Sequence, residues 1–241
     1  MTKYKIGIDV GGTFTDFLLT REDGQSYTYK VLTTPDDPSV ATMKGIAEMA
    51  DDRNISAKEF LKDVTVIVHG TTVTTNAVLT STGAKTALVT TKGVRDALEM
   101  RRGIREEQYN NRYCNAEPLV ERYLRWPVEE RLDYKGDVIT PLRAKDVKDG
   151  AEFFLKQRVE AIAICFMNSF AAGKHEKLAA RIIKDKVPSA YLTVSSSFLP
   201  SIRFYDRVST TVLNSYVGPI LKRYLDALLK KLAGEDYRAC F

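Results

Sequence analysis

The sequence predicts an α/β protein in which a mixed β-sheet is flanked by helices. Two observations support this class. The chain opens with three short segments that have the alternating or β-branched pattern of strands and are separated by glycine-containing turns. Patterns with helical spacing then alternate with short apolar strands over most of the remaining chain. A run of strands followed by alternating helices and strands is the pattern of a layered α/β domain.

The three opening strands are expected to form an antiparallel meander. Residues 4–10 alternate between apolar and polar types, and a Gly-Gly pair makes a tight turn after them. Residues 13–20 are rich in β-branched and aromatic types, and the turn Glu22-Asp23-Gly24 joins them to a third strand over residues 27–32. This meander argues against a simple doubly wound dinucleotide fold. It suits a ribonuclease H-like domain, the unit that actin-like ATPases and sugar kinases use twice.

Helices and strands are expected to alternate after the meander. Residues 39–50 have helical spacing, and the expected buried stripe is Val40, Met43, Ile46, Ala47 and Ala50. The other expected elements are strands over 63–68, 86–90, 161–166 and 191–195, and helices ending at 79 and covering 94–100, 144–158, 174–186 and 208–232. The last helix is expected to be kinked or broken near Gly218-Pro219.

The regular pattern is interrupted once, which suggests three parts. Residues 101–142 hold many Arg, Glu, Asn and Tyr residues and three prolines, so we expect an inserted, surface-lying subdomain with short strands. Residues 1–100 are expected to form the N-terminal part of the ribonuclease H-like domain. Residues 143–241 are expected to continue the α/β domain and to end in the long helix, with the second half of an actin-like ATPase missing.

Composition and charge exclude several classes of protein. The chain has 241 residues, 44% of them apolar, which is enough for a sizeable core, and no apolar run is long enough to cross a bilayer. The net charge is +5, but basic and acidic residues are interspersed, so we expect no nucleic-acid partner and no membrane partner. The cysteines Cys114, Cys165 and Cys240 have neither disulfide nor metal-ligand spacing, and they indicate a reducing cytoplasm.

The first chemical motif is the turn inside the segment DVGGTFTD, residues 9–16. Gly11 and Gly12 let the backbone approach an anion closely, so that consecutive N–H groups can cradle phosphate oxygens. The hydroxyls of Thr13 and Thr15 can add further donors. The alternative is a plain hairpin with a Gly-Gly turn. The motif matches neither the P-loop nor the dinucleotide-binding glycine pattern.

Two carboxylates flank this turn, which a plain hairpin does not explain. Asp9 ends the first strand and could hold Mg²⁺ or orient an attacking water. Asp16 faces the same side if the second strand keeps its alternation. Asp9 and Asp16 are therefore catalytic candidates, with Asp9 also the candidate metal ligand.

The second motif is the segment VHGTTVTTN, residues 68–76, where a strand is expected to lead into a helix. His69 could act as a general acid, a general base or an orienting donor. Gly70, Thr71, Thr72 and Asn76 are candidate substrate contacts, because helix N-termini bind anions and polarised carbonyls. On spacing alone the favoured interpretation is simpler: the threonines cap the helix and His69 is an interior group.

The third motif is an arginine cluster. Arg101, Arg102 and Arg105 could clamp a carboxylate, carbonate or phosphate of the substrate, although a solvated charged loop is the favoured alternative. His175, beside Lys174 and Glu176, is expected at the surface. The segment 205–207, YDR, is expected to cap the long helix or form an ion pair.

Several segments together resemble the hydantoinase A/5-oxoprolinase/acetone carboxylase family. The resemblance spans the chain and rests on residues 6–16, 69–76, 90–96, 118–120, 161–166 and 209–217. Residues 98–109, LEMRRGIREEQY, resemble most the branch that contains acetophenone carboxylase-type subunits.

This resemblance implies an actin-like ATPase fold with ATP and Mg²⁺ as cofactors. It implies phosphorylation of a carbonyl or lactam oxygen. In hydantoinases and oxoprolinases this step activates a cyclic amide for hydrolysis. In ketone carboxylases it accompanies activation of the ketone as an enol phosphate and carboxylation from bicarbonate. The resemblance also implies a hydantoinase B-like second subunit, a small cyclic amide or ketone as substrate, and an oligomer.

Two features depart from the family pattern. Many relatives carry Glu where Ser201 and Asp206 stand, so no family-wide role is assigned to these positions. Family members also continue into a second half, so the chain alone is expected to be inactive. The alternatives are a truncated module that only binds a partner subunit, and a sugar-kinase-like protein.

The long helix carries an apolar stripe that is wider than one packed face requires, and this indicates self-association or partner binding. Its members are Leu213, Ile220, Leu221, Tyr224, Leu225, Leu228 and Leu229.

Overall fold

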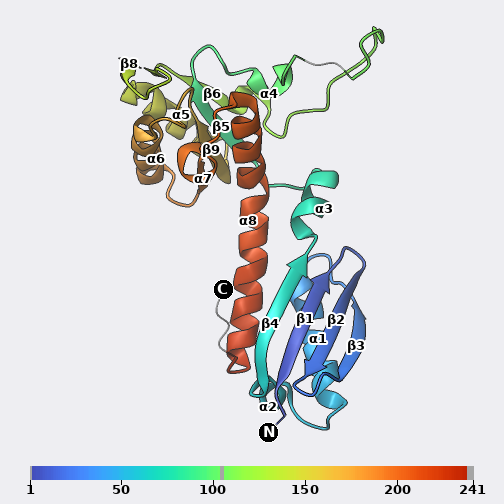
Figure 1. The fold of residues 1–241 in the computed structure, drawn as a ribbon. Helices are drawn as coiled ribbons and strands as arrows, with labels where there is room; N and C mark the ends of the chain where they lie inside the picture. Colours follow the sequence, from blue (N-terminus) through green and yellow to red (C-terminus); the bar gives the residue numbers. More distant parts are fainter. Residues whose placement is uncertain (1, 104–105, 238–241) are drawn as a thin grey trace. The chain divides into compact units, whose positions relative to one another are not determined.

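The computed structural model describes residues 2–103 and 106–237, which fall into two compact units. Unit 1 comprises residues 1–82 and 220–241, and unit 2 comprises residues 83–219 (Figure 1). This division differs from the expected boundaries at 100 and 143. The chain leaves unit 1 directly after residue 82, and residues 143–219 belong to the same unit as the segment expected to be an insertion.

Unit 1 is built on a four-stranded mixed sheet with the order β3-β2-β1-β4. The strands β1 (Tyr4–Val10), β2 (Phe14–Arg21) and β3 (Ser26–Leu32) are antiparallel, and they confirm the expected meander. Gly24 adopts a φ of 88° in the hairpin turn between β2 and β3, where a side chain would be strained. The strand β4 (Val64–Thr71) runs parallel to β1 and makes the sheet mixed.

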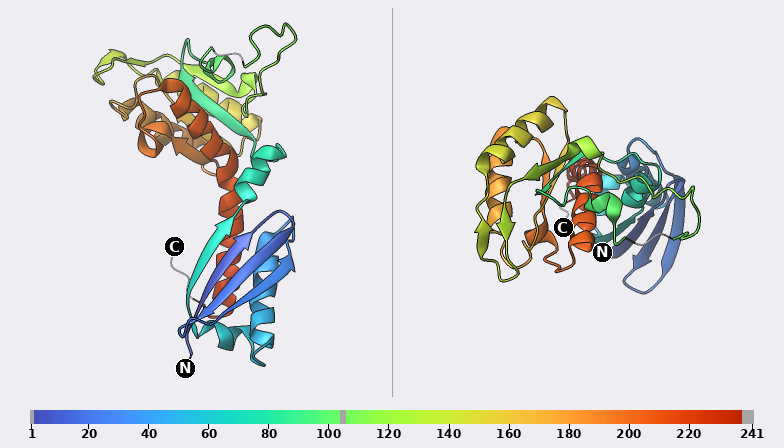
Figure 2. Two further views of the ribbon diagram at one scale, coloured as in Figure 1. Left: turned by 45° about the vertical axis from the view of Figure 1, so that its right-hand side comes forward. Right: turned by 90° about the horizontal axis from the view of Figure 1, so that it is seen from above.

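One face of this sheet is packed and the other is open. Helix α1 (Pro38–Asp51) covers the packed face, as Figure 2 shows, together with α2 (Ala57–Leu61). The final part of α8 (Phe204–Gly234) adds Tyr224, Leu228 and Leu232 to the same core. On the open face Leu18 is 48% exposed and Val68 is 65% exposed. Short helix α3 (Val73–Leu79) follows β4.

The buried stripe of α1 differs from the expected one. Val40 is exposed, whereas the buried residues are Ser39, Ala41, Thr42, Gly45, Ile46, Met49 and Ala50. The reason is a close contact: a Cβ atom at Gly45 would lie 2.2 Å from Cζ of Phe17. The helix therefore turns Gly45 toward the sheet together with Ile46 and Met49, and Val40 is left exposed.

Unit 2 is built on a four-stranded parallel sheet with the order β10-β9-β5-β6. Its strands are β5 (Thr86–Thr91), β6 (Arg125–Val128), β9 (Ala161–Cys165) and β10 (Tyr191–Val194). Every residue of β5 and β9 is buried, as is typical of parallel strands that are covered on both faces.

Helices and a small hairpin surround the sheet of unit 2. Helices α5 (Ala144–Lys156) and α6 (Lys174–Lys186) pack against each other, as Figure 1 shows. The other elements of unit 2 are α4 (Ala97–Met100), the 3-10 helix η1 (Arg122–Leu124), α7 (Ser195–Phe198), the first part of α8, and the strands β7 (Arg131–Leu132) and β8 (Val138–Thr140).

The segment 101–142 contains the expected short strands but is more than a surface insertion. Its strand β6 belongs to the main sheet of unit 2, paired with β5. Val120, Leu124, Val128 and Leu132 are fully buried. These apolar side chains complete the core of unit 2. The polar composition of the segment, from which a surface-lying subdomain was expected, did not indicate this.

Buried acidic side chains join the carboxyl ends of the strands in unit 2. Glu176 is fully buried and accepts hydrogen bonds from the backbone N–H groups of Phe166 at 2.8 Å and Ser196 at 2.7 Å. Glu130 bonds to Nδ1 of His175 at 2.8 Å. His175 is therefore buried and not at the surface as expected, because its partner comes from a segment 45 residues away.

The apolar stripe of α8 is largely covered within the chain. Tyr224 and Leu228 belong to the core of unit 1, and Leu221 and Leu225 pack against it in part. Leu213 is 39% exposed. The stripe therefore does not present the wide apolar face that the sequence suggested.

The described residues include no helix that is both long and apolar enough to cross a membrane. Cys114 is exposed and Cys165 is buried, and both are free thiols. Cys240 lies outside the described residues.

A glycine substitution tests the contact that sets the phase of α1. We expect Gly45→Ala to lower the free energy of unfolding by about 1–3 kcal/mol, because the added methyl group overlaps the buried ring of Phe17. This loss should exceed the gain of up to about 1 kcal/mol that alanine brings to a helix interior. Chemical denaturation measures the difference. Gly234→Ala is the control, since no described residue lies within 4 Å of a Cβ atom there. Equal effects of the two changes would contradict the packing argument.

Candidate functional site

The parallel pairing of β1 with β4 brings two sequence motifs to one edge of the sheet of unit 1. Asp9 is the register partner of Gly70, and Val10 is the partner of Thr71. After these residues, β1 leads into the Gly-Gly turn and β4 leads into Thr72. The N–H of Thr72 donates to the carbonyl of Val10 at 3.0 Å, and its hydroxyl contacts the same carbonyl at 3.2 Å.

Hydrogen bonds of two threonine side chains, Thr33 and Thr15, support the Gly-Gly turn. The N–H of Gly11 donates to the carbonyl of Phe14 at 3.0 Å, and the hydroxyl of Thr33 donates to the carbonyl of Gly11 at 2.9 Å. Thr15 is fully buried and its hydroxyl lies 2.9 Å from that of Thr33. Thr15 therefore positions the turn and does not reach the surface as an extra donor, whereas Thr13 is exposed.

Neighbouring atoms lie so close to Gly11 and Gly12 that a side chain would collide with them. The backbone angles do not require glycine, since neither residue has a positive φ. A Cβ atom at Gly11 would lie 2.9 Å from the carbonyl oxygen of Phe14. A Cβ atom at Gly12 would lie 3.0 Å from Nδ2 of Asn76. In the described part of the chain, the N–H groups of Gly12 and Thr13 donate to no protein acceptor, so the turn presents two backbone donors.

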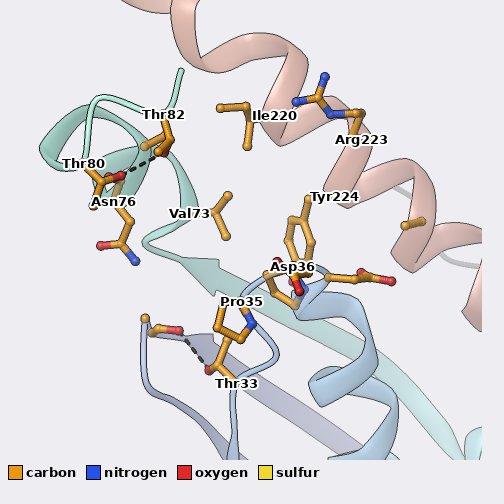
Figure 3. Close-up of a pocket in the computed structure, with 16 residues that line it drawn as sticks. Thr33, Pro35, Asp36, Val73, Asn76, Thr80, Thr82, Ile220, Arg223 and Tyr224 are labelled. Carbon is orange, nitrogen blue, oxygen red and sulfur yellow. Dashed lines mark hydrogen bonds between the residues drawn. The ribbon is translucent and has the colours of Figure 1, made fainter. Parts of the chain in front are cut away.

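A cavity of about 660 Å³ opens beside this turn within unit 1 (Figure 3). Gly11, Gly12 and Thr33 form one wall, and Asn76 of α3 forms another. Figure 3 shows that Tyr224 of α8 closes the opposite side. Its volume lies in the range of pockets that bind small molecules and cofactors.

The two predicted carboxylates lie on the open face of the sheet. Asp9 and Asp16 are register partners on β1 and β2, and both are exposed, so they share a face as expected. They line a shallow hollow with Gly7 and Val68. Asp16 forms an ion pair with Lys30 at 2.9 Å, whereas Asp9 forms no ion pair among the residues described.

His69 faces the helical side of the sheet. Its Nε2 lies 2.6 Å from the hydroxyl of Tyr224, and its Nδ1 is buried and has no hydrogen-bond partner among the residues described. Burial lowers the pKa of His69, although the charge of Asp9 opposes this shift. Burial also raises the pKa of Tyr224 to about 12. Because both ring nitrogens are enclosed, the geometry assigns His69 to joining β4 and α8, and it gives no support to proton transfer by His69 to a substrate.

The predicted arginine clamp is engaged with acidic side chains of unit 2. Arg101 forms an ion pair with Glu106, and Arg102 bonds to both carboxylate oxygens of Asp206 at 2.8 and 3.1 Å. The expected ion pair of the segment 205–207 is therefore present. Arg105 lies outside the described residues.

Two residues of the site, Thr33 and Tyr224, were not predicted to belong to it. Thr33 supports the turn and Tyr224 bonds to His69, yet they lie 22 and 155 residues away in sequence from the groups they bond. Neither belongs to a recognisable motif. Only the antiparallel pairing of β2 with β3 places Thr33 under the turn, and only the packing of α8 brings Tyr224 to β4.

A divalent metal would depend on few protein ligands in this chain. The residues described contain no group of three or more His, Cys, Asp or Glu side chains that could hold a metal ion. Mg²⁺ is usually held by one or two carboxylates together with substrate phosphates, and it keeps several waters. Asp9, which is exposed and unpaired beside the turn, fits that mode of binding.

Comparison with known proteins identifies related chains. Residues 5–187 match the family model described as the hydantoinase/oxoprolinase N-terminal region. The chain is 36% identical to the caprolactamase subunit alpha of Pseudomonas jessenii, over 97% of this chain and 34% of that protein. It is 32% identical to the acetophenone carboxylase gamma subunit of Aromatoleum aromaticum, over 98% of this chain and 34% of that protein. The chain thus spans about a third of the length of these relatives.

Solved structures show the same fold. The crystal structure of the ATP-dependent caprolactamase from Pseudomonas jessenii matches with a TM-score of 0.89 and 34% identity, over 99% of this chain and 35% of that one. A nucleotide-free structure of acetone carboxylase matches with a TM-score of 0.87 and 24% identity, over 98% of this chain and 35% of that one.

The buried imidazole makes stability depend on pH. The folded pKa of His69 lies below its ordinary value of 6.5, so the unfolded chain binds a proton at this residue first as the pH falls. The contribution of His69 is therefore retained above about pH 6.5 and lost progressively below it, by at most about 1.4 kcal/mol per pH unit. We expect His69→Gln to have a smaller loss of unfolding free energy between pH 7 and 5 than the wild type, by chemical denaturation.

The two proteins differ only at residue 69, so the contributions of all other ionisable groups cancel in this comparison. Tyr224→Phe is the matched control: it removes the hydroxyl partner but keeps the titrating imidazole, and it should retain the pH dependence. An identical pH profile for the wild type and His69→Gln would contradict the assignment.

Proposed function

Because the chain belongs to the hydantoinase/oxoprolinase family, we propose that it is the nucleotide-binding part of an ATP-dependent enzyme that activates a carbonyl or lactam oxygen by phosphorylation. The observation that carries the proposal is the Gly-Gly turn, which presents two backbone donors and directly follows the strand that ends with the exposed carboxylate of Asp9 and Val10. Backbone donors and a nearby carboxylate suit a polyphosphate with its Mg²⁺ better than a neutral ligand.

The proposed fold assignment is ribonuclease H-like, as in actin-like ATPases. The order β3-β2-β1-β4, with three antiparallel strands and β4 parallel to β1, supports it. The turn between β1 and β2 then occupies the position at which a phosphate would be held. One structural relative is named as an ATP-dependent caprolactamase, and ATP dependence agrees with a phosphate at this turn.

In the proposed mechanism, the N–H groups of Gly12 and Thr13 donate to phosphate oxygens and fix the terminal phosphoryl group. The exposed carboxylate of Asp9 would hold hydrated Mg²⁺, which would supply positive charge next to the phosphates. The bond from the terminal phosphorus to ADP breaks as a bond to the substrate oxygen forms. Asn76 lies beside Gly12 and is placed to bond to a phosphate or to the substrate carbonyl.

The substrate is proposed to be a cyclic amide or a ketone, and the partner a hydantoinase B-like subunit in a larger assembly. The relatives are themselves described as alpha, gamma and beta subunits. The open face of the sheet in unit 1, with Leu18 and Val68 exposed, supports coverage by further protein. The cytoplasm is the proposed location.

A module that only binds a partner subunit is the second candidate, and the same open sheet face favours it. Nucleotide binding separates the two. A partner-binding module need not bind ATP, whereas the proposed function requires weak binding even by this chain alone. We expect a Kd of roughly 0.1 mM or weaker by calorimetry, since the walls of one unit supply only part of the contacts of a tight site.

Substitution of the proposed Mg²⁺ ligand tests the mechanism. We expect Asp9→Asn to reduce ATP hydrolysis by the assembled enzyme about a hundredfold or more while retaining some nucleotide binding, because the shape is kept and the charge is lost. Asp16→Asn is the matched control on the same face. Its carboxylate is paired with Lys30, so the loss should be much smaller. Unchanged ATPase activity in Asp9→Asn would exclude the proposed role of Asp9.

Substitution in the turn tests phosphate binding separately. Gly12→Val places branched carbon atoms where Nδ2 of Asn76 already lies 3.0 Å from a Cβ position, and it narrows the approach to the N–H donors. We expect ATP binding to disappear in calorimetry. A second variant, Gly12→Ala with Asn76→Ala, relieves the contact and should recover part of the binding. Full binding by Gly12→Val would show that the nucleotide does not use this turn.

A further inference from the structure

The loop after β5 in unit 2 has no role in the proposed phosphate turn, although it carries a segment of the family resemblance. The N–H of Val94 donates to the carbonyl of Thr91 at 3.2 Å, and Gly93 between them has a φ of 98°. This geometry requires glycine, as in a type II turn. The N–H of Lys92 donates to the carbonyl of Val128 at 2.8 Å. The loop is thus fixed to the end of β6.

Two cavities adjoin this loop, with volumes of about 470 and 430 Å³. They share Lys92, Arg95 and Pro127 as lining residues. Trp126 lines the second cavity, and it is the only tryptophan of the chain. In parallel sheets, ligands usually bind at loops outside the carboxyl ends of the strands, which is where Lys92 and Arg95 lie.

Positive charge exceeds negative charge around the shared wall. Asp96 lies 3.0 Å from Arg122, 3.6 Å from Arg95 and 3.7 Å from Arg125. These arginines, with Arg122 the largest influence, hold the pKa of Asp96 below its ordinary value. Lys92 is exposed and forms no ion pair in the part of the chain that is described.

Arg125 is buried in this wall, with 1% of its side chain exposed. It reaches Glu99 at 3.2 Å, but its Nη1, which lies 3.7 Å from Asp96, has no hydrogen-bond partner in the described part of the chain. Four cations, Lys92, Arg95, Arg122 and Arg125, thus lie at this wall, and the carboxylates of Asp96 and Glu99 compensate only two of their charges.

The other acidic residues of the second cavity do not remove this surplus. Glu129 and Asp146 pair with Arg143 at 3.2 and 3.5 Å, and Asp149 pairs with Lys145 at 2.6 Å. Among all the charged residues that line the two cavities, six are basic and four are acidic, so the positive charge of the lining exceeds the negative charge by two. A buried guanidinium with incomplete compensation is stabilised by one more anion nearby.

We propose that unit 2 contains an oxyanion site at this loop, which binds the phosphate or carboxylate group of a small molecule. Lys92 and Arg95 contact the oxyanion directly. The buried positive charge of Arg125 stabilises the bound oxyanion without touching it. The site belongs to unit 2 and does not depend on nucleotide binding at the turn of unit 1.

The fluorescence of Trp126 reports on this site directly, because no other tryptophan contributes to the signal. The experiment titrates inorganic phosphate, and separately acetate, into the Gly12→Val protein, with chloride at matched ionic strength as the reference. The Gly12→Val background removes the turn of unit 1 as a competing phosphate site. We expect a saturable change with phosphate, with acetate or with both, and the stronger ligand identifies the class of oxyanion.

Neutral variants decide whether the proposed side chains are responsible. Lys92→Met with Arg95→Met should raise the Kd about tenfold or more, since each removes a charge-assisted hydrogen bond. Lys148→Met, an exposed lysine of α5 outside both cavities, should leave the Kd unchanged. The proposal is overturned if the response equals that of chloride, if neither oxyanion saturates, or if the double variant binds like its parent. A negative result here does not contradict nucleotide binding at the Gly-Gly turn of unit 1, because ATP binding by the wild type is measured independently.

Discussion

The pairing of β1 with β4 is the constraint on which the candidate site depends. These strands are 60 residues apart in sequence, but their parallel register places Asp9 beside Gly70 and the Gly-Gly turn beside Thr72. Parallel neighbours end at the same edge of a sheet, so two polar segments that follow them must meet there. Without this pairing, the turn would be an ordinary hairpin connection. With it, backbone donors, a carboxylate and Asn76 surround one edge.

Period-two patterns made the sheet of unit 1 predictable. Residues 4–10 alternate, and the strand β1 covers the same residues. The Gly-Gly turn and the shared face of Asp9 and Asp16 follow from the same alternation. The sequence also identified helix α6 with its correct bounds, because its apolar spacing is regular. The local sequence pattern was therefore sufficient to predict most elements of this sheet and the location of the turn.

The errors arose where a distant residue decides the environment. Helix α1 turns Gly45 inward because Phe17 occupies the space above it. His175 is buried because Glu130 accepts its hydrogen bond, and Tyr224 encloses His69 from the far end of the chain. The boundary between the units was missed for a related reason. The apolar residues of the segment 101–142 lie among polar ones, and their burial depends on strands that come before and after them.

Unit 1 is discontinuous in sequence, which has a consequence for biosynthesis. Its core requires Tyr224, Leu228 and Leu232, which are synthesised only after unit 2, whereas unit 2 is continuous from residue 83 to residue 219. During translation, unit 2 can therefore complete its core while the sheet of unit 1 still lacks one covering helix. Until residues 224–232 are synthesised, the core of unit 1 lacks these three side chains, and an incompletely buried core of this kind favours binding by a chaperone.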